Sequence, residues 1–258
     1  MINHRNIESV ETRSLSTRSL LLSVLLGSHP PRLPLSALVA FCGLFERRAG
    51  TVRTALSRMA AAGEVVQVER PDGSAAYEVA GPLLERQRQQ DVGRGAATVE
   101  WDGRWITAIV LADARPVAER RRFRSQMVGS KMGELRPDVW MRPANLDPPA
   151  ADDGLVVSIG SLDGPPDADL VGELWDLDAI DARSEELRTA LGRDDGSDLA
   201  ATFLVLAATL NHLRVEPQLP VALGRTDTGD GLRRAYATSE QRFQTDLRAF
   251  LADVSTFS

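Results

Sequence analysis

The sequence predicts an α+β protein with an N-terminal winged helix-turn-helix, a middle ferredoxin-like α+β domain and a C-terminal helical domain. Three observations predict this class. Three helical segments and a hairpin lie within the first 82 residues, a strand, helix, strand, strand order follows, and the remainder has helical periodicity. We expect a winged-helix domain at 1–82, a helical linker at 83–98, a ferredoxin-like core and dimerisation domain at 99–175, and a helical domain at 176–258.

Two helices are expected ahead of the helix that would read DNA. Residues 16–26 begin with Ser and Thr capping candidates, carry leucines at helical spacing and stop at Gly27. Residues 34–41 start with Pro, which the first helical turn tolerates, and end near Gly43. A helix-turn-helix needs such helices to bury the back of the recognition helix.

The third helix, starting at Glu46 or Ala49, is amphipathic, and a hairpin follows it. Its apolar stripe consists of Val52, Ala55, Leu56 and Met59. The opposite face carries short polar and cationic side chains: Thr51, Arg53, Thr54, Ser57 and Arg58. After Gly63, a plausible C-cap residue, residues 65–69 and 75–79 read as strands joined by a Pro-Asp-Gly turn.

This arrangement predicts a DNA-binding face, although a basic helix face can also be merely solvated. Arg47, Arg48 and Arg70 would contact phosphates, and Thr51 lies on the same helix face. The residues expected to read base edges in the major groove are Arg53, Thr54, Ser57 and Arg58. Residues 1–95 hold 12 basic and 9 acidic residues (+3), and the remainder holds 18 and 27 (−9), which gives −6 overall. This asymmetry would direct the N-terminal domain towards phosphate.

Composition argues against several other classes. The single Cys42 cannot form an internal disulfide, which fits a reducing cytoplasm. His4, His29 and His212 lack ligand spacing, and neither a phosphate loop nor a nucleophile elbow is present. No apolar run is long enough to cross a bilayer. We therefore expect a cytoplasmic protein that is not an enzyme, with no catalytic residue, metal, resident cofactor or membrane partner.

Beyond the linker, the pattern alternates before it becomes helical. Strands are expected at 105–111, 139–141 and 155–159, with a basic helix at 117–130 whose Val117, Phe123 and Met127 could face inward. Helices are expected at 178–191, 198–213 and 241–251.

The order of several pieces resembles the PaaX family of bacterial transcriptional regulators over nearly the whole chain. The pieces are "RSLLLSVLLG", "VRTALSRMAAAG", "WDGRW", "ERRRFRSQMVGSKMGELRPDVWMRP" and "EPQLP". The resemblance implies a winged helix, a ferredoxin-like core similar to the small CRISPR-associated nuclease, and a helical C-terminal domain. It also implies a dimeric repressor of aromatic catabolism, released from DNA in the best-known members by phenylacetyl-coenzyme A. Glu64, Met132 and "RTDTGD" after Pro220 depart from the family pattern, so a different ligand or none stays open.

An acyl-CoA or aryl-CoA effector would need cationic and aromatic partners. The candidates are Arg120, Arg121, Arg124, Trp101 and Trp140. Alternatively, the arginines form a solvated face or pair with acidic stretches, and the tryptophans are buried anchors.

We therefore expect a homodimer that binds a palindromic operator in double-stranded DNA and represses a catabolic operon until an acyl-CoA-type effector releases it. One alternative is a metal-dependent nuclease in which Asp113 of each subunit holds Mg²⁺. Another is a ligand-sensing interaction protein that does not bind DNA.

Overall fold

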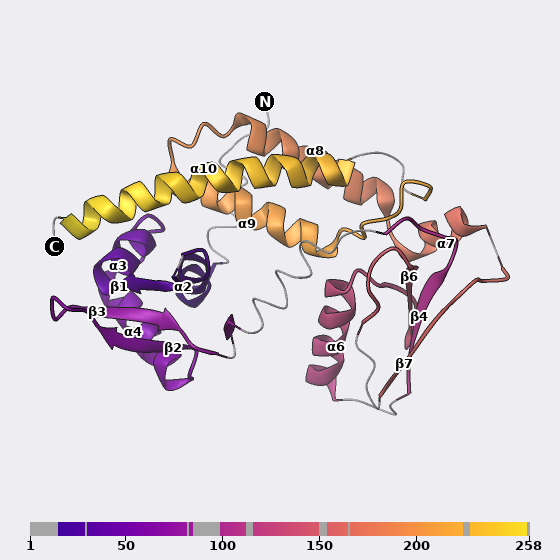
Figure 1. The fold of residues 1–258 in the computed structure, drawn as a ribbon, viewed down its shortest axis with the longest axis horizontal. Helices are drawn as coiled ribbons and strands as arrows, with labels where there is room; N and C mark the ends of the chain where they lie inside the picture. Colours follow the sequence, from indigo (N-terminus) through magenta and orange to yellow (C-terminus); the bar gives the residue numbers. More distant parts are fainter. Residues whose placement is uncertain are drawn as a thin grey trace. The chain divides into compact units, whose positions relative to one another are not determined.

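The computed structural model describes residues 15–28, 30–81, 83–84, 99–111, 116–149, 154–164, 166–223 and 228–256, which form an α+β protein with two antiparallel sheets (Figure 1). The chain divides into two compact units. The first unit comprises Met1–Gly95, Asp194–Leu206 and Thr238–Ser258, and the second comprises Ala96–Arg193 and Ala207–Ala237.

The first unit opens with three helices and a three-stranded sheet. Its elements are α2 (Thr17–Leu26), β1 (Arg32–Pro34), α3 (Leu35–Gly43), α4 (Ala49–Ala61), β2 (Val65–Glu69) and β3 (Ala75–Val79). The strand order is β1-β3-β2, so β1 and β2 flank the central strand. The three helices and the β2-β3 hairpin were predicted from the sequence. Strand β1 was not, because it is three residues long and ends in a proline.

Helix α4 has the two faces that its sequence predicted. Val52 and Leu56 are fully buried and Met59 is 2% exposed, while Ala55 is half-buried. Gly63 follows the helix with a φ of 70°, and the amide of Glu64 donates to the carbonyl of Met59. This is a Schellman ending, in which a residue in the left-handed region satisfies the last helical carbonyls. The turn then leads directly into β2.

Two later helices also contribute to the first unit. They are α9 (Leu199–Val215), with residues up to Leu206, and α10 (Thr228–Thr256), with residues from Thr238. The ring of Phe203 lies 5.5 Å from Phe41, 5.3 Å from Phe45 and 6.1 Å from Phe243, measured between centroids. The segment 176–258, expected as one helical domain, is therefore distributed over both units, and its boundaries stay a prediction.

The second unit is built on a four-stranded antiparallel sheet with the order β5-β6-β4-β7. Its further elements are β4 (Trp105–Val110), α6 (Val117–Gly129), β5 (Gly133–Arg136), β6 (Val139–Pro143), β7 (Leu155–Gly160), α7 (Asp167–Leu174) and α8 (Leu177–Arg193). Strand β5 and helix α7 were not predicted, because both are short. The helix predicted at 241–251 covers only part of α10. The predicted linker at 83–98 lies almost wholly outside the described residues.

Each face of this sheet carries its own core. Ile106, Ala108 and Trp140 pack with Met127 of α6 on one face. Trp105 and Met141 pack with α7 on the other face. Figure 1 shows α6 and α7 on opposite sides of this sheet. Met127 and Phe123 of α6 lie inward as expected, but Val117 is 64% exposed because it lies in the first turn, before the helix covers the sheet.

No helix in the described part of the chain combines the length and the apolar character that a membrane span requires.

Candidate functional site

Helix α4 presents a continuous exposed face opposite its buried stripe. Arg48 precedes the helix as its N-cap residue with extended backbone, and its side chain is exposed. The other exposed side chains are Thr51, Arg53, Thr54, Ser57 and Arg58. The hydroxyl of Thr54 donates to the carbonyl of Gly50 at 2.9 Å. The structure thus places five of the eight predicted DNA-contacting residues on one exposed face of α4, with Arg48 exposed at the N-terminus of the helix.

The exposed arginines at α4 differ from Arg18 and Arg32, two other arginines of the first unit. Within the described residues, Arg48, Arg53 and Arg58 form no ion pair with a carboxylate. Arg18, in contrast, pairs with Glu64 at 2.6 Å, and Arg32 pairs with Glu78 at 2.5 Å. The pair with Arg18 holds the pKa of the Glu64 carboxyl below its ordinary value, chiefly through the side-chain hydrogen bond. Unneutralised positive charge is therefore available on α4.

Arg47 points elsewhere than its neighbour Arg48. Its Nη2 donates to the carbonyl of Leu15 at 3.0 Å, and its Nε is buried with no hydrogen-bond partner among the described residues. This arrangement ties the turn before α4 to the start of α2. A contact between Arg47 and a phosphate stays a prediction, and it would require the guanidinium to leave the Leu15 carbonyl. The adjacent Cys42 is fully buried, and burial raises the pKa of its thiol to about 12, as expected for a small core residue.

Arg70 lies in the turn between β2 and β3. Its guanidinium is 3.0 Å from the carboxylate of Asp72 and donates to the hydroxyl of Ser74 at 3.2 Å. The Ser74 hydroxyl, more than Arg70, lowers the pKa of Asp72. A pocket of about 300 Å³ that was not predicted adjoins the turn. It is lined by Arg32, Pro34, Val68, Glu69, Arg70, Pro71 and Ala76. To contact a phosphate, Arg70 would have to break its ion pair with Asp72.

The predicted effector residues are divided between the two faces of the second sheet. Arg120 and Arg121 are exposed on α6. Arg124 forms an ion pair with Glu134 and lies 5.5 Å from the centre of the Trp140 ring, which is only 4% exposed. Trp101 lies on the opposite face, beside Trp105 at 6.3 Å, and its indole donates to the carbonyl of Arg104. Trp140 is thus buried in one core and the partly buried Trp101 packs against the other, while effector binding by these residues stays a prediction.

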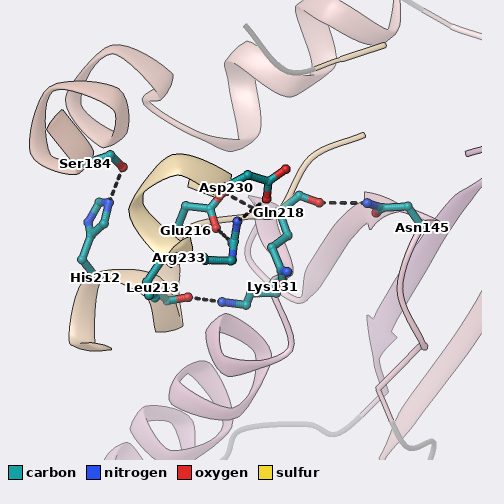
Figure 2. Close-up of polar contacts among 9 residues, drawn as sticks. All are labelled: Lys131, Asn145, Ser184, His212, Leu213, Glu216, Gln218, Asp230 and Arg233. Carbon is teal, nitrogen blue, oxygen red and sulfur yellow. Dashed lines mark hydrogen bonds and ion pairs between the residues drawn. The ribbon is translucent and has the colours of Figure 1, made fainter. Parts of the chain in front are cut away.

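A polar cluster in the second unit was not foreseen from the sequence (Figure 2). We define it as Lys131, Asn145, Glu216, Gln218 and Arg233. The Lys131 ammonium donates to the carbonyl of Leu213 in the last turn of α9, and Arg233 pairs with Glu216, which is 8% exposed. The backbone N–H of Gln218 donates to the Glu216 carboxylate at 3.0 Å, and Asn145 Nδ2 donates to the backbone carbonyl of Gln218 at 2.8 Å. The motif "EPQLP" at 216–220 was the only sequence signal for it.

Cations outnumber carboxylates around this cluster. Burial lowers the pKa of Lys131 to about 8, and Glu216 opposes that shift while Arg233, Arg142 and Arg214 add to it. Arg142 is 1% exposed and donates to Pro143, Ser130 and Asn145, and burial lowers its pKa to about 10.

His212 lies at the edge of the same region. Its Nε2 is 2.8 Å from the hydroxyl of Ser184, and burial lowers its pKa. It is thus a polar residue of a largely apolar helix. The described residues contain no group of three potential metal ligands, and Asp113, on which the nuclease alternative depends, lies outside them.

Two comparisons with known proteins give matches. Residues 16–82 match a family model described as PaaX-like protein. The solved structure of the uncharacterized protein Rv0674 from Mycobacterium tuberculosis is 35% identical in sequence, and the match covers 94% of this chain and 100% of that chain with a TM-score of 0.71. No curated protein matches the chain. The family match spans α2, α3, α4 and the small sheet, and the structural match extends over nearly the whole chain.

Proposed function

The chain belongs to the PaaX-like family, whose members are generally transcriptional regulators of phenylacetate catabolism, and we propose that it binds a specific operator DNA. The observation that carries the proposal is the exposed face of α4. Arg53 and Arg58 lie on this face and Arg48 lies at the N-terminus of the helix, all without carboxylate partners in the described structure, while the opposite stripe anchors the helix in the core. Such a face has charge for phosphates and donors for base edges.

The element order supports a winged helix-turn-helix. Helices α3 and α4 are joined by a short turn, and the β2-β3 hairpin follows α4, with β1 completing the sheet. In this arrangement the second helix of the pair enters the major groove and the hairpin forms the wing. Arg53 and Arg58 are suited to guanine edges, whereas Thr51, Thr54 and Ser57 discriminate less. Arg70 in the wing would contribute a phosphate contact once it released Asp72.

The second unit would serve dimerisation and effector sensing. Its sheet order β5-β6-β4-β7, with α6 after the first strand, supports a ferredoxin-like core. A homodimer would present two copies of α4 to successive major grooves of a palindromic site and would repress by occluding a promoter in the cytoplasm. Arg120 and Arg121 are the exposed cations that could receive the phosphates of an acyl-CoA effector.

DNA binding is tested by titrating the protein into labelled DNA from upstream of its own gene at several salt concentrations. We expect R53A or R58A to weaken specific binding by roughly 1 to 3 kcal/mol without changing thermal stability. The matched control is R188A, because Arg188 is an exposed helical arginine of α8, paired with Glu185. L56A is the converse control: the side chain is fully buried, so its loss costs about 2 to 5 kcal/mol of stability and affects binding only through unfolding.

Three outcomes would redirect the proposal. If R53A and R58A bind like the wild type at matched salt, α4 is not the recognition helix. If the DNA is cleaved when Mg²⁺ is added, the nuclease alternative gains support. If no DNA is bound in a salt-dependent way, the protein senses its ligand without DNA.

The effector is tested separately with a panel of aryl-CoA and acyl-CoA thioesters. A thioester that binds the folded protein must raise its melting temperature, and one that favours the DNA-incompetent state must also release the operator. R120A together with R121A should weaken both effects. A panel that changes neither quantity removes the acyl-CoA proposal and leaves DNA binding untouched.

A further inference from the structure

The two edges of the second sheet differ in how they are protected. Edge strand β5 carries Glu134 and Arg136, and its pairing with β6 is irregular between these residues. Edge strand β7 has the sequence LVVSIG and no charged residue. The exposed fractions of Val156 and Ile159 are 44% and 46%. Charges and bulges at an edge prevent pairing with another chain. Strand β5 has both devices and β7 has neither.

The alternation of hydrogen bonds between β4 and β7 identifies which backbone groups of β7 point away from β4. The amide of Leu111 donates to the carbonyl of Gly154 at 3.0 Å, just beyond the paired strands. In an antiparallel ladder, bonded and non-bonded pairs alternate along the strands. The backbone N–H and C=O groups of Leu155, Val157 and Ile159 therefore point away from β4. Among the strands that the structure describes, β4 is the sheet neighbour of β7.

We propose that β7 pairs with β7 of a second copy of this chain, antiparallel and about a two-fold axis through Val157. Val157 would then face its own symmetry mate, and Leu155 would face Ile159 of the second copy, so outward groups meet outward groups on both sides. A two-fold axis brings identical segments together, so a charged edge would repel itself. Strand β7 is uncharged and meets this condition. The inference deepens the proposed function, because it supplies the interface of the operator-binding dimer.

Apolar side chains continue from the strand onto the neighbouring surface. Ile109 of β4 pairs with Val156, so both lie on the same sheet face, and Ile109 is 41% exposed. Leu111 and Leu162 flank the strand and are 60% and 43% exposed. A second copy on this edge would cover these side chains, which adds apolar burial to the backbone hydrogen bonds.

The first test places charge on the edge. V156K combined with I159K should raise the dimer dissociation constant by about tenfold or more, measured by analytical ultracentrifugation. The control is L135K, because Leu135 is 36% exposed on the opposite edge strand β5 and should tolerate the same charge. Circular dichroism melting verifies that each variant is folded. A wild type that is monomeric, or a double variant that dimerises like the wild type, overturns the proposal.

The second test probes the register. With the axis at Val157, Val156 lies opposite Ser158 of the second copy as a non-bonded pair, whose Cα atoms are about 4.5 Å apart, within disulfide range. V156C combined with S158C should therefore form a covalent dimer on oxidation, whereas V156C alone and S158C alone should not. The native Cys42 is buried and does not interfere. A double variant that stays uncrosslinked overturns this pairing.

Operator binding is recorded alongside, so the two proposals can fail independently. Loss of dimerisation in V156K/I159K with no DNA binding by any form would keep the β7 interface and remove the operator. Operator binding by a V156K/I159K protein that remains dimeric would keep the operator and remove the β7 interface.

Discussion

The surroundings of Lys131 lower the pKa of its ammonium group. Lys131 has a φ of 60°, caps the last turn of α9 and is half-buried near the Glu216–Arg233 ion pair. A cation at a helix C-terminus is favoured by the helix dipole. Desolvation outweighs that gain here and lowers the pKa from 10.5 to about 8. The protein therefore holds the Lys131 proton less tightly when folded than when unfolded.

This shift predicts how stability varies with pH. Between about pH 8 and about pH 10.5 the unfolded chain binds more protons at this site, so its contribution to the free energy of unfolding rises as the pH rises. K131M should abolish that rise. Urea unfolding of both proteins at about pH 7.5 and about pH 10 measures the difference. An identical pH dependence in the two proteins would mean that Lys131 titrates normally.

Glu46 is a second residue held in an unfavourable conformation. Its φ is 58°, and it ends α3 in the same way that Gly63, with a φ of 70°, ends α4. The left-handed region costs a side-chain-bearing residue about 1 kcal/mol or slightly more. We expect E46G to raise the free energy of unfolding by about 0.5 to 1 kcal/mol, and G63A to lower it by a similar amount. Denaturant titration of the pair checks this, and a stabilising G63A would contradict it.

At the scale of elements, the contact between β5 and α7 requires a missing side chain. A Cβ built on Gly133 would lie 2.8 Å from Cβ of Leu174 and 3.0 Å from the ring of Trp175. Moving either neighbour would cost packing energy, because Leu174 lies in the core of that sheet face and Trp175 packs against this core. The glycine thus allows α7 to approach the sheet closely.

G133A should therefore cost about 1 to 3 kcal/mol of stability through overpacking. G129A is the matched control, because nothing lies within 4 Å of the added Cβ at the end of α6. Thermal unfolding of both variants distinguishes a local clash from a general intolerance of change. Equal melting temperatures for G133A and the wild type would show that α7 adjusts without cost.

At the scale of the whole molecule, neither compact unit is continuous in sequence, because each combines segments that are far apart along the chain. Residues 194–206 and 238–256 belong with the N-terminal helices, and the ring of Phe203 packs against the rings of both Phe41 and Phe45. A segment ending at residue 95 would lack these partners and expose the two phenylalanines of α3 and the turn after it.

The fragment 1–95 should consequently be much less stable than the first unit of the intact chain. F203A in the full-length protein isolates one part of this effect and should cost about 3 to 5 kcal/mol, as for other buried phenylalanines. Chemical denaturation of the fragment, the variant and the wild type tests the order of stability. A fragment as stable as the intact first unit would mean that the C-terminal segments only cover the N-terminal helices.

Several elements were predictable from local sequence because their signals repeat over a few residues. The apolar spacing of Val52, Leu56 and Met59 determined which face of α4 is buried, and the Pro-Asp-Gly turn determined the hairpin. Capping at Ser16 and the glycine after α4 gave the helix ends, and Ser16 indeed accepts a hydrogen bond from the amide of Ser19. These features depend on neighbours within one or two turns, so the sequence alone specifies them.

The rest was decided only by tertiary structure, because it depends on residues far apart in the chain. Lys131 is hydrogen-bonded to Leu213, 82 positions away, and Asn145 to Gln218, 73 positions away. The periodicity of neighbouring residues carries no information about such distant pairs. Burial of Trp140 and Trp101 on opposite sheet faces, and the turning of Arg47 towards Leu15, likewise follow from packing. A side chain's partner and its pKa are set by which distant groups exclude water from it, and that is fixed when the elements assemble.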